Sequence, residues 1–417
     1  MGRSAPARVR GGVARPRRLR AVIALAAVTA VTLAGCGRSD TGTAPAAPAS
    51  EGAPIVIAAS FDQSGPLAAT QFLGRGVSAY LAKVNADGGL NGRQVKYVQY
   101  DDAYDPSRLT ANARRAVEQD RASIFISFGG PSLAIRPYLN QNKVLHLVFA
   151  GNTPFSDVAQ FPYTHAWWPD IAWESAIDAA YLKQSQPGVK LGILGYNNDL
   201  TDSQVAGVKA GGLEPASVLR VPPSQLDTTS QVTQLKAAGV DAVLLSVGNG
   251  QVISTVKYMN QIGYTPKTFI YSTAAGRLAT IDAITPAAAK GIYTTLWLTD
   301  PGDPKATGDT ALAGYFDDVK KYGNGADPGD SLVLQGYTAA AALANAVKTA
   351  SAQNPDAYNA AWNATKDLKV PGLLPGTSLS AGSHGRLVHQ YQIVQFDGTA
   401  WAPVGGVEDA TSKGFAK

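Results

Sequence analysis

The sequence has little of the chemistry on which most enzymes and metalloproteins depend. Its 417 residues include one cysteine, Cys36, and four histidines. A single thiol excludes an internal disulfide and a cysteine-rich metal cluster. The chain also lacks a Walker-type loop, a G-x-S-x-G elbow and an H-E-x-x-H motif, and Gly74-Arg75-Gly76 lacks the remainder of a dinucleotide fingerprint. We therefore predict a binding protein that uses no cofactor or metal, and not an enzyme.

Two groups of titratable residues leave alternatives open. Asp101-Asp102, at the end of a predicted strand, fits an acid/base pair, a hard-metal site or loop support. Because adjacent strand residues point to opposite faces, we favour loop support. His384 and His389 lie five positions apart, a poor spacing for a metal site, so we expect surface or packed imidazoles.

The excess of positive charge lies at the N-terminus. The chain carries 36 Lys and Arg against 31 Asp and Glu, a balance that suggests a nucleic-acid partner only if the excess belongs to the folded part. Residues 1–35 hold seven arginines and no acid, so 29 of the 36 basic residues remain against the 31 acids, a net charge of −2. We therefore predict no nucleic-acid partner.

The N-terminal segment is typical of an export signal. Basic residues 15–20 (RPRRLR) precede an apolar run over 21–33 and the sequence Leu33-Ala34-Gly35-Cys36. As a helix the run spans roughly 20 Å, short of the ~30 Å hydrocarbon core of a bilayer, which disfavours a permanent transmembrane helix. The pair Arg17-Arg18 leaves twin-arginine export open beside the general secretory route.

The LAGC sequence is similar to the lipobox of bacterial lipoproteins. This likeness implies that residues 1–35 are a lipoprotein signal peptide and that Cys36 is lipidated; an ordinary secretory signal with an incidental cysteine is the alternative. Residues 36–54 are small and proline-rich without apolar periodicity, as expected of a flexible tether. We predict that this anchor holds the folded part at the extracytoplasmic face of the cell membrane.

From residue 55 onward, apolar runs of strand length alternate with segments of helical periodicity. The predicted strands are 55–59, 95–100, 124–128, 145–149, 191–194, 218–221, 242–247, 268–271 and, in a β-rich tail, 387–396. The predicted helices are 73–86, 106–120, 132–142, 173–184, 203–210, 230–238, 252–262, 308–322 and 331–350. This pattern predicts an α/β fold with mostly parallel sheets, and the chain length favours two lobes.

Doubly wound sheets bind ligands beyond the carboxyl ends of their strands. The segments expected there are 60–72, 101–102, 129–132, 150–154, 195–201, 248–251 and 272–277. Gly129-Gly130-Pro131-Ser132 offers amides and a hydroxyl to an anion, with a plain helix cap as the equal alternative. Tyr163, Trp167, Trp168 and Trp173 supply rings that either stack on a ligand or pack between lobes.

Several turn, cap and strand signals recur in one order over residues 64–106. They are SGPL at 64–67, Gly74 and Gly76, VNADGGLNGR at 84–93, Asp101-Asp102 and Asp105-Pro106. Together they resemble the leucine/isoleucine/valine-binding family of periplasmic substrate-binding proteins. The likeness continues more loosely through Pro154, the YMNQIGYTP segment at 258–266 and residues 336–350.

The resemblance implies a two-lobed type I periplasmic-binding-protein fold with three interlobe crossovers. The lobes would close on a small solute and deliver it to the permease of an ABC importer. It places residues 53–168 plus 297–378 in lobe 1 and residues 169–296 plus 379–417 in lobe 2. The aromatic, proline-containing segment 167–169 stands where the first crossover is expected.

The resemblance also implies a set of ligand contacts in both lobes. The predicted contacts are Phe72, Gly130, Ser132, Ala150, Asn152, Trp168, Asn198, Asn249 and Thr273. In this family a hydroxyl and amides hold the ligand carboxylate, and an acid near position 273 pairs with its ammonium. Residues 272–275 (STAA) contain no acid. Because a buried ammonium without a counter-charge is costly, we expect a neutral, apolar or carboxylate-only solute.

Two other functions remain open at this point. A sensor or regulator with the same fold would present a ligand-dependent surface to an envelope partner. A secreted α/β hydrolase is disfavoured because no nucleophile motif is present.

The lipid anchor gives a direct prediction. We expect Cys36→Ala to release the protein from membranes into the soluble fraction, because the apolar run before it is too short to anchor the chain by itself. Cell fractionation with immunoblotting measures this shift. An unmodified Cys36 thiol in mass spectra of membrane-extracted native protein would contradict the prediction.

Overall fold

The computed structural model describes residues 52–416 of the chain. The predicted signal peptide, Cys36 and most of the predicted tether lie outside these residues. Among the helices within 52–416, none is long and apolar enough to cross a membrane.

The first sheet consists of five parallel strands in the order β2-β1-β3-β4-β5. Its strands are β1 (Ile55–Phe61), β2 (Val95–Asp101), β3 (Ile124–Phe128), β4 (Leu145–Phe149) and β5 (Thr164–Ala166). The order places a topological switch point between β1 and β3, where loops on opposite faces leave room for a ligand.

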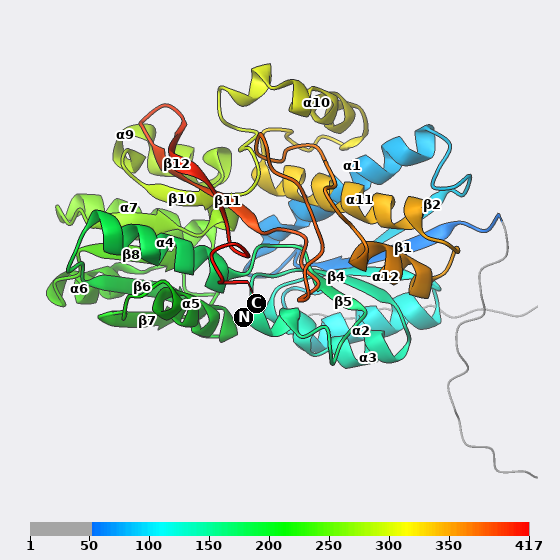
Figure 1. Ribbon diagram of the computed structural model, residues 1–417, viewed down its shortest axis with the longest axis horizontal. Helices are drawn as coiled ribbons and strands as arrows, with labels where there is room; N and C mark the ends of the chain where they lie inside the picture. Colours follow the sequence, from blue (N-terminus) through cyan, green and yellow to red (C-terminus); the bar gives the residue numbers. More distant parts are fainter. Residues whose placement is uncertain (1–51, 417) are drawn as a thin grey trace, which may run out of the picture. The chain divides into compact units, whose positions relative to one another are not determined.

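The second sheet has seven strands in the order β12-β11-β10-β9-β8-β6-β7. Its strands are β6 (Leu191–Tyr196), β7 (Ser217–Val221), β8 (Ala242–Ser246), β9 (Lys267–Ile270), β10 (Tyr293–Leu296), β11 (Gln390–Phe396) and β12 (Trp401–Asp409). Strands β6 to β10 are parallel, whereas β11 and β12 extend the sheet in antiparallel pairs beside β10 (Figure 1).

Helices cover both faces of each sheet. They are α1 (Gln71–Ala86), α2 (Pro106–Glu118), α3 (Arg136–Gln141), α4 (Ile171–Ser185), α5 (Asp199–Ala210), α6 (Thr229–Ala237), α7 (Asn249–Gln261), α8 (Asp282–Ile284), α9 (Pro286–Ala289), α10 (Thr310–Tyr322), α11 (Ser331–Thr349) and α12 (Pro355–Asn363). In β1, Ile57 and Ala59 face the core shared with α1 and α11, while Ala58 faces the core shared with α2 and α3. This two-residue alternation with both faces buried explains the nearly continuous apolar runs of the parallel strands.

The chain passes between the two sheets three times. After β5 it enters α4 and the second sheet; after β10 it returns to the first sheet, where α11 packs on α1 and α12 contacts β4. It then re-enters the second sheet with β11 and β12. The predicted α/β class with two mostly parallel sheets is confirmed. The lobe boundaries at 168/169, 296/297 and 378/379 stay predictions.

Several local signals have the predicted geometry. Asp105 caps α2 by accepting the Arg108 backbone N–H, with Pro106 at the first helical position. Gly88 and Gly89 follow α1 with φ of 98° and 88°, a conformation that glycine adopts without strain.

Other predictions of secondary structure are wrong in detail. The helix predicted over 132–142 is a 3₁₀ turn, η2 (Gly130–Leu133), followed by the short α3, because Pro137 has no backbone N–H to continue a helix from the residues before it. The strands β5, β10 and β12 and the helix α12 were not predicted. β12 is an edge strand that contains Pro403, Gly405 and Gly406, a composition that does not resemble a strand.

The contact between α1 and α11 depends on two glycines. A Cβ on Gly336 would collide with the Leu73 carbonyl, and a Cβ on Gly76 would collide with the Val333 carbonyl. Both clashes are with backbone atoms, which cannot move away as a flexible side chain does.

We expect Gly336→Ala to destabilise the protein by about 1–3 kcal/mol, because the added methyl group overpacks this helix contact. Gly314→Ala in α10 is the matched control, since its Cβ would meet nothing within 4 Å and alanine favours a helix by about 1 kcal/mol. Urea unfolding of both variants tests the prediction. Equal stability of Gly336→Ala and the parent protein would contradict it.

Candidate functional site

One cavity of about 240 Å³ lies where the carboxyl-end loops of the two sheets meet. The loops after β1, β3 and β4 line it from one side, and the loops after β6, β8 and β9 line it from the other. This is the edge at which a doubly wound sheet is expected to bind a ligand.

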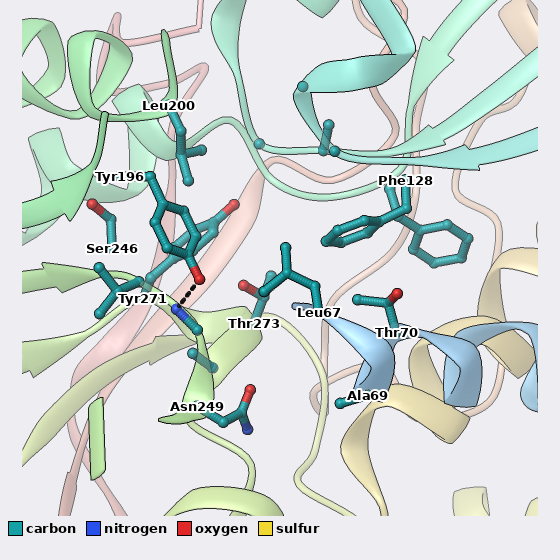
Figure 2. Close-up of a pocket in the computed structure, with 18 of the residues that line it drawn as sticks. Leu67, Ala69, Thr70, Phe128, Tyr196, Leu200, Ser246, Asn249, Tyr271 and Thr273 are labelled. Atoms are coloured by element: carbon teal, nitrogen blue, oxygen red, sulfur yellow. Dashed lines mark hydrogen bonds between the residues drawn. The ribbon is translucent and has the colours of Figure 1, made fainter. Parts of the chain in front are cut away.

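The wall contributed by the first sheet is mostly apolar. Phe128 and Phe149 end β3 and β4, and Trp168 packs edge-on against both rings, with centroids 5.6 Å and 6.1 Å away. Leu67 lies in the loop after β1 and packs against an apolar cluster of the second lobe. In Figure 2 its side chain lies between Phe128 on one side and Thr273 on the other.

The wall contributed by the second sheet carries more polar groups. The hydroxyl of Tyr196 accepts a hydrogen bond from the Gly248 N–H at 2.7 Å, drawn as a dashed line in Figure 2. The Tyr271 hydroxyl donates to the Pro169 carbonyl at 3.3 Å. Burial raises the pKa of Tyr196 to about 12 and that of Tyr271 well above its ordinary value, so both phenols are neutral at physiological pH.

Within residues 52–416, no Asp, Glu, His, Lys or Arg side chain lines the cavity. The nearest acid behind the loop after β9 is Glu174 of α4, whose two carboxyl oxygens accept from the N–H and the hydroxyl of Ser272 at 2.9 and 2.8 Å. Burial and the neighbouring Asp178 raise the pKa of Glu174 well above its ordinary value. Burial also raises the pKa of Asp178 to about 7.

A fully buried arginine supports the cavity from behind. The Arg386 guanidinium donates to the carbonyls of Ala150, Asn152 and Trp168 at 3.1, 2.7 and 2.5 Å. It also lies 3.4 Å from a carboxylate oxygen of Asp170. Three of these partners belong to the segments that form the cavity wall, so Arg386 fixes the position of their backbone.

A model of the periplasmic binding protein family matches residues 54–400. The chain belongs to the periplasmic binding protein family. The predicted resemblance to leucine/isoleucine/valine-binding proteins is confirmed, and this family comprises substrate-binding proteins of transporters rather than enzymes.

The relatives of this periplasmic binding protein are distant in sequence. Leu/Ile/Val-binding protein homolog 7 of Brucella melitensis is 26% identical over 253 residues, which cover 54% of this chain and 60% of the relative. The match therefore spans less than two thirds of that relative's length.

Solved structures share the fold over nearly all the described residues. A branched-chain amino acid ABC transporter protein from Thermus thermophilus with bound valine has a TM-score of 0.76 at 17% identity, covering 85% of this chain and 96% of that one. A solute-binding protein from R. palustris in complex with 4-hydroxybenzoate has a TM-score of 0.71 at 17% identity, covering 85% and 97%. The predicted two-lobed type I fold is confirmed.

Seven of the nine predicted ligand contacts line the cavity of this periplasmic binding protein. They are Gly130, Ala150, Asn152, Trp168, Asn198, Asn249 and Thr273. Phe72 does not line it, because it lies in α1 and packs against the lobe core, with the Arg75 guanidinium 5.3 Å from its ring centre. The neighbouring Leu67, Ala69 and Thr70 line the cavity instead.

Ser132 also lies away from the cavity. It is completely buried, its hydroxyl donates to the Phe128 carbonyl at 3.1 Å, and it accepts from the Ser127 hydroxyl at 2.7 Å. A solute would have to break these hydrogen bonds to use the hydroxyl. We therefore leave Ser132 and Phe72 out of the proposed ligand contacts.

The polar side chains that line the cavity differ in whether their hydrogen-bonding atoms already have partners in the protein. The Asn198 side chain caps α5 by accepting the Leu200 N–H, and the Asn249 amide donates to the Thr280 hydroxyl at 2.8 Å. The amide nitrogen of Asn152 and the indole nitrogen of Trp168 are buried without a hydrogen-bond partner in residues 52–416.

Sequence reasoning did not single out several aromatic residues of the site. Phe128, Phe149 and Tyr196 are the last residues of buried strands, Tyr271 directly follows β9, and Tyr104 lies in the loop after β2. The available signal was position, because the end of a parallel strand points toward the ligand edge. Arg386 had no local signal in the sequence.

The remaining titratable candidates support the structure. Asp101 accepts from the N–H groups of Gln63 and Ala103 and from the Ser64 hydroxyl, so the prediction of loop support is confirmed. His384 and His389 pack on the Trp173 ring, and burial lowers the pKa of His384 to about 3. Within the described part of the chain no cluster of three potential metal ligands occurs.

Two of the other aromatic residues singled out in the sequence, Trp167 and Tyr163, contact residues away from the cavity. Trp167 packs edge-on against Trp297 and Trp362, and the Tyr163 hydroxyl donates to Asp356. Only Trp168, among the four rings singled out in the sequence, lines the cavity.

The buried carboxyls predict a specific dependence of stability on pH. Because the folded-state pKa of Asp178 is raised, the folded protein binds a proton that the unfolded chain has lost, so the stability contribution falls as pH rises from about 4 to about 7. Relative to the parent protein, Asp178→Asn should gain stability between pH 5 and pH 8.

Chemical unfolding at each pH measures this difference. Asp397→Asn is the control, because backbone N–H groups lower the pKa of that exposed carboxyl and it stays ionised over the same range. A parallel pH dependence of the parent protein and Asp178→Asn would contradict the prediction.

Proposed function

We propose that this protein is an extracytoplasmic solute receptor, anchored to the cell membrane through lipidated Cys36, that captures a small organic solute and delivers it to an ABC importer. The observation that carries the proposal is a single cavity formed by carboxyl-end loops of both sheets in a chain of the periplasmic binding protein family. Contacts divided between two lobes make binding and lobe closure one event.

Contacts that join the two lobes support the proposed closure. The Thr153 N–H, in the loop after β4, donates to the Ser203 hydroxyl of α5 at 3.1 Å. Leu67, in the loop after β1, packs against an apolar cluster of the second lobe, so apolar surface is buried across the cleft. We propose lobes of residues 53–168 plus 297–378 and residues 169–296 plus 379–417, which place Thr153 and Ser203 on opposite sides.

The solved relatives show that this fold accepts different solutes. One was solved with valine and another with 4-hydroxybenzoate. The solute of this chain is therefore set by the residues of its own cavity wall, for which we propose direct contacts from Phe128, Asn152 and Trp168.

A thermal-shift screen over amino acids, aromatic acids, amides and polyols tests solute capture. A solute that binds only the folded state stabilises it by about 2.7 kcal/mol at 100 times its dissociation constant. We expect Phe128→Ala to weaken binding of a solute identified in this screen about 10- to 100-fold, because burying such a ring contributes ~1.5–3 kcal/mol of free energy. Phe72→Ala is the matched control and should leave affinity unchanged.

Delivery is tested by uptake. Deletion of the gene should abolish high-affinity uptake of the identified solute in the source strain, and the chain with Cys36→Ala should restore it poorly. Binding of a solute whose uptake does not depend on the gene would refute delivery and favour the sensor function. Equal loss of affinity in Phe128→Ala and Phe72→Ala would refute the proposed site.

A further inference from the structure

Resting on the proposed receptor function, we infer that the solute combines an apolar body with an oxygen acceptor at its polar end and carries no ammonium or other cationic group. Three features of one cavity point to this class: an uncharged lining, an aromatic wall in the first lobe, and an uncapped helix N-terminus in the second.

The lining offers nothing that neutralises a cation. Of the segment 272–275, Thr273 and Ala274 line the cavity, and neither can balance an ammonium. The carboxyl of Glu174 lies behind this segment with both oxygens already hydrogen-bonded to Ser272. A cation enclosed here would lose its hydration without a counter-charge.

Asp199 is a further acid close to the site, and it does not line the cavity. It stands at the first position of α5, where the helix dipole already stabilises a carboxylate. One of its oxygens is 3.7 Å from the place of a Cβ on Gly130, and the other is buried without a hydrogen-bond partner in the described chain. A test of the inference must therefore show whether Asp199 can act as the counter-charge of a cationic solute.

The apolar body has a built receptor in the first lobe. Phe128, Phe149 and Trp168 form one contiguous aromatic surface, and Leu67 and Leu332 add aliphatic surface. Flat aromatic faces of this kind bind rings or branched alkyl groups through buried area and dispersion.

The polar end has donors on the opposite side. Helix α7 is 13 residues long, and its N-cap, Gly248, provides no side-chain cap. No acid stands in the first turn, and Asn249, Gly250 and Gln251 of that turn line the cavity. Free N–H groups and the helix dipole both favour an oxygen acceptor.

A second, independent observation is the presence of two donors, unpartnered in the described chain, on the first-lobe side of the cavity. The amide nitrogen of Asn152 and the indole nitrogen of Trp168, on the first-lobe side, are buried without a hydrogen-bond partner in residues 52–416. Both residues line the cavity and both are more than nine-tenths buried. Buried donors in folded proteins are normally paired, and an oxygen acceptor on the solute would pair these two.

Calorimetry with matched ligands tests the inference. The probes are leucine, 4-methylpentanoate and 4-methylpentanamide, and phenylalanine, 3-phenylpropanoate and 3-phenylpropanamide. Within each set only the charged groups change. We expect the deaminated acid or amide of at least one set to bind at least tenfold more tightly than its amino acid, and the comparison of acid with amide identifies the acceptor.

A designed reversal completes the test. Thr273→Asp introduces a carboxylate into the lining and should shift the ratio of affinities at least tenfold toward the amino acid over its deaminated partner. If thermal melting shows that this variant is unfolded, Ala274→Asp replaces it in the test. Leucine or phenylalanine binding as tightly as its deaminated partners overturns the inference, and loss of that binding in Asp199→Asn would name Asp199 as the counter-charge. Failure of all six probes also overturns it, while the broader solute screen and the uptake assay still decide the receptor function.

Discussion

The buried guanidinium of Arg386 is the interaction on which the binding region depends. A charge removed from water is tolerated only when its hydrogen bonds are satisfied, and Arg386 satisfies them with the carbonyls of Ala150, Asn152 and Trp168 and with the carboxylate of Asp170. These acceptors lie in the loop after β4 and in the passage from β5 to α4. The last return of the chain to the second sheet therefore holds in place the wall formed by the first.

The same cluster connects the wall to the helices around it. Asp170 accepts the Ala172 N–H and so caps α4, and it also accepts the Thr153 hydroxyl at 2.8 Å. One carboxylate thus joins a helix start, a loop of the first lobe and the arginine of the final crossover. Such a network is rigid because each member has its partners, and a single replacement would leave a buried charge without compensation.

The lining of the cavity is neutral because nearby charged groups are hydrogen-bonded to residues behind its walls. Arg386 pairs with Asp170 behind one wall, and Glu174 is bound to Ser272 behind the other. What faces the cavity is aromatic surface, neutral phenols and the start of α7. The fold places backbone donors at this edge, since parallel strands end and helices begin there, whereas the side chains decide which solute fits.

The sequence alone determined the features that depend on neighbours along the chain. Short apolar runs identified β1, β3 and β4, Asp105 marked the start of α2, and the absence of an acid in residues 272–275 was readable directly. Family resemblance then selected seven residues that line the cavity. Only the tertiary structure decided that the Ser132 hydroxyl turns inward, that Leu67 takes the place expected of Phe72, and that Arg386 reaches residues more than 200 positions away. The physical reason is that local patterns report backbone conformation and burial, whereas a side chain's partners are set by which distant segments pack beside it.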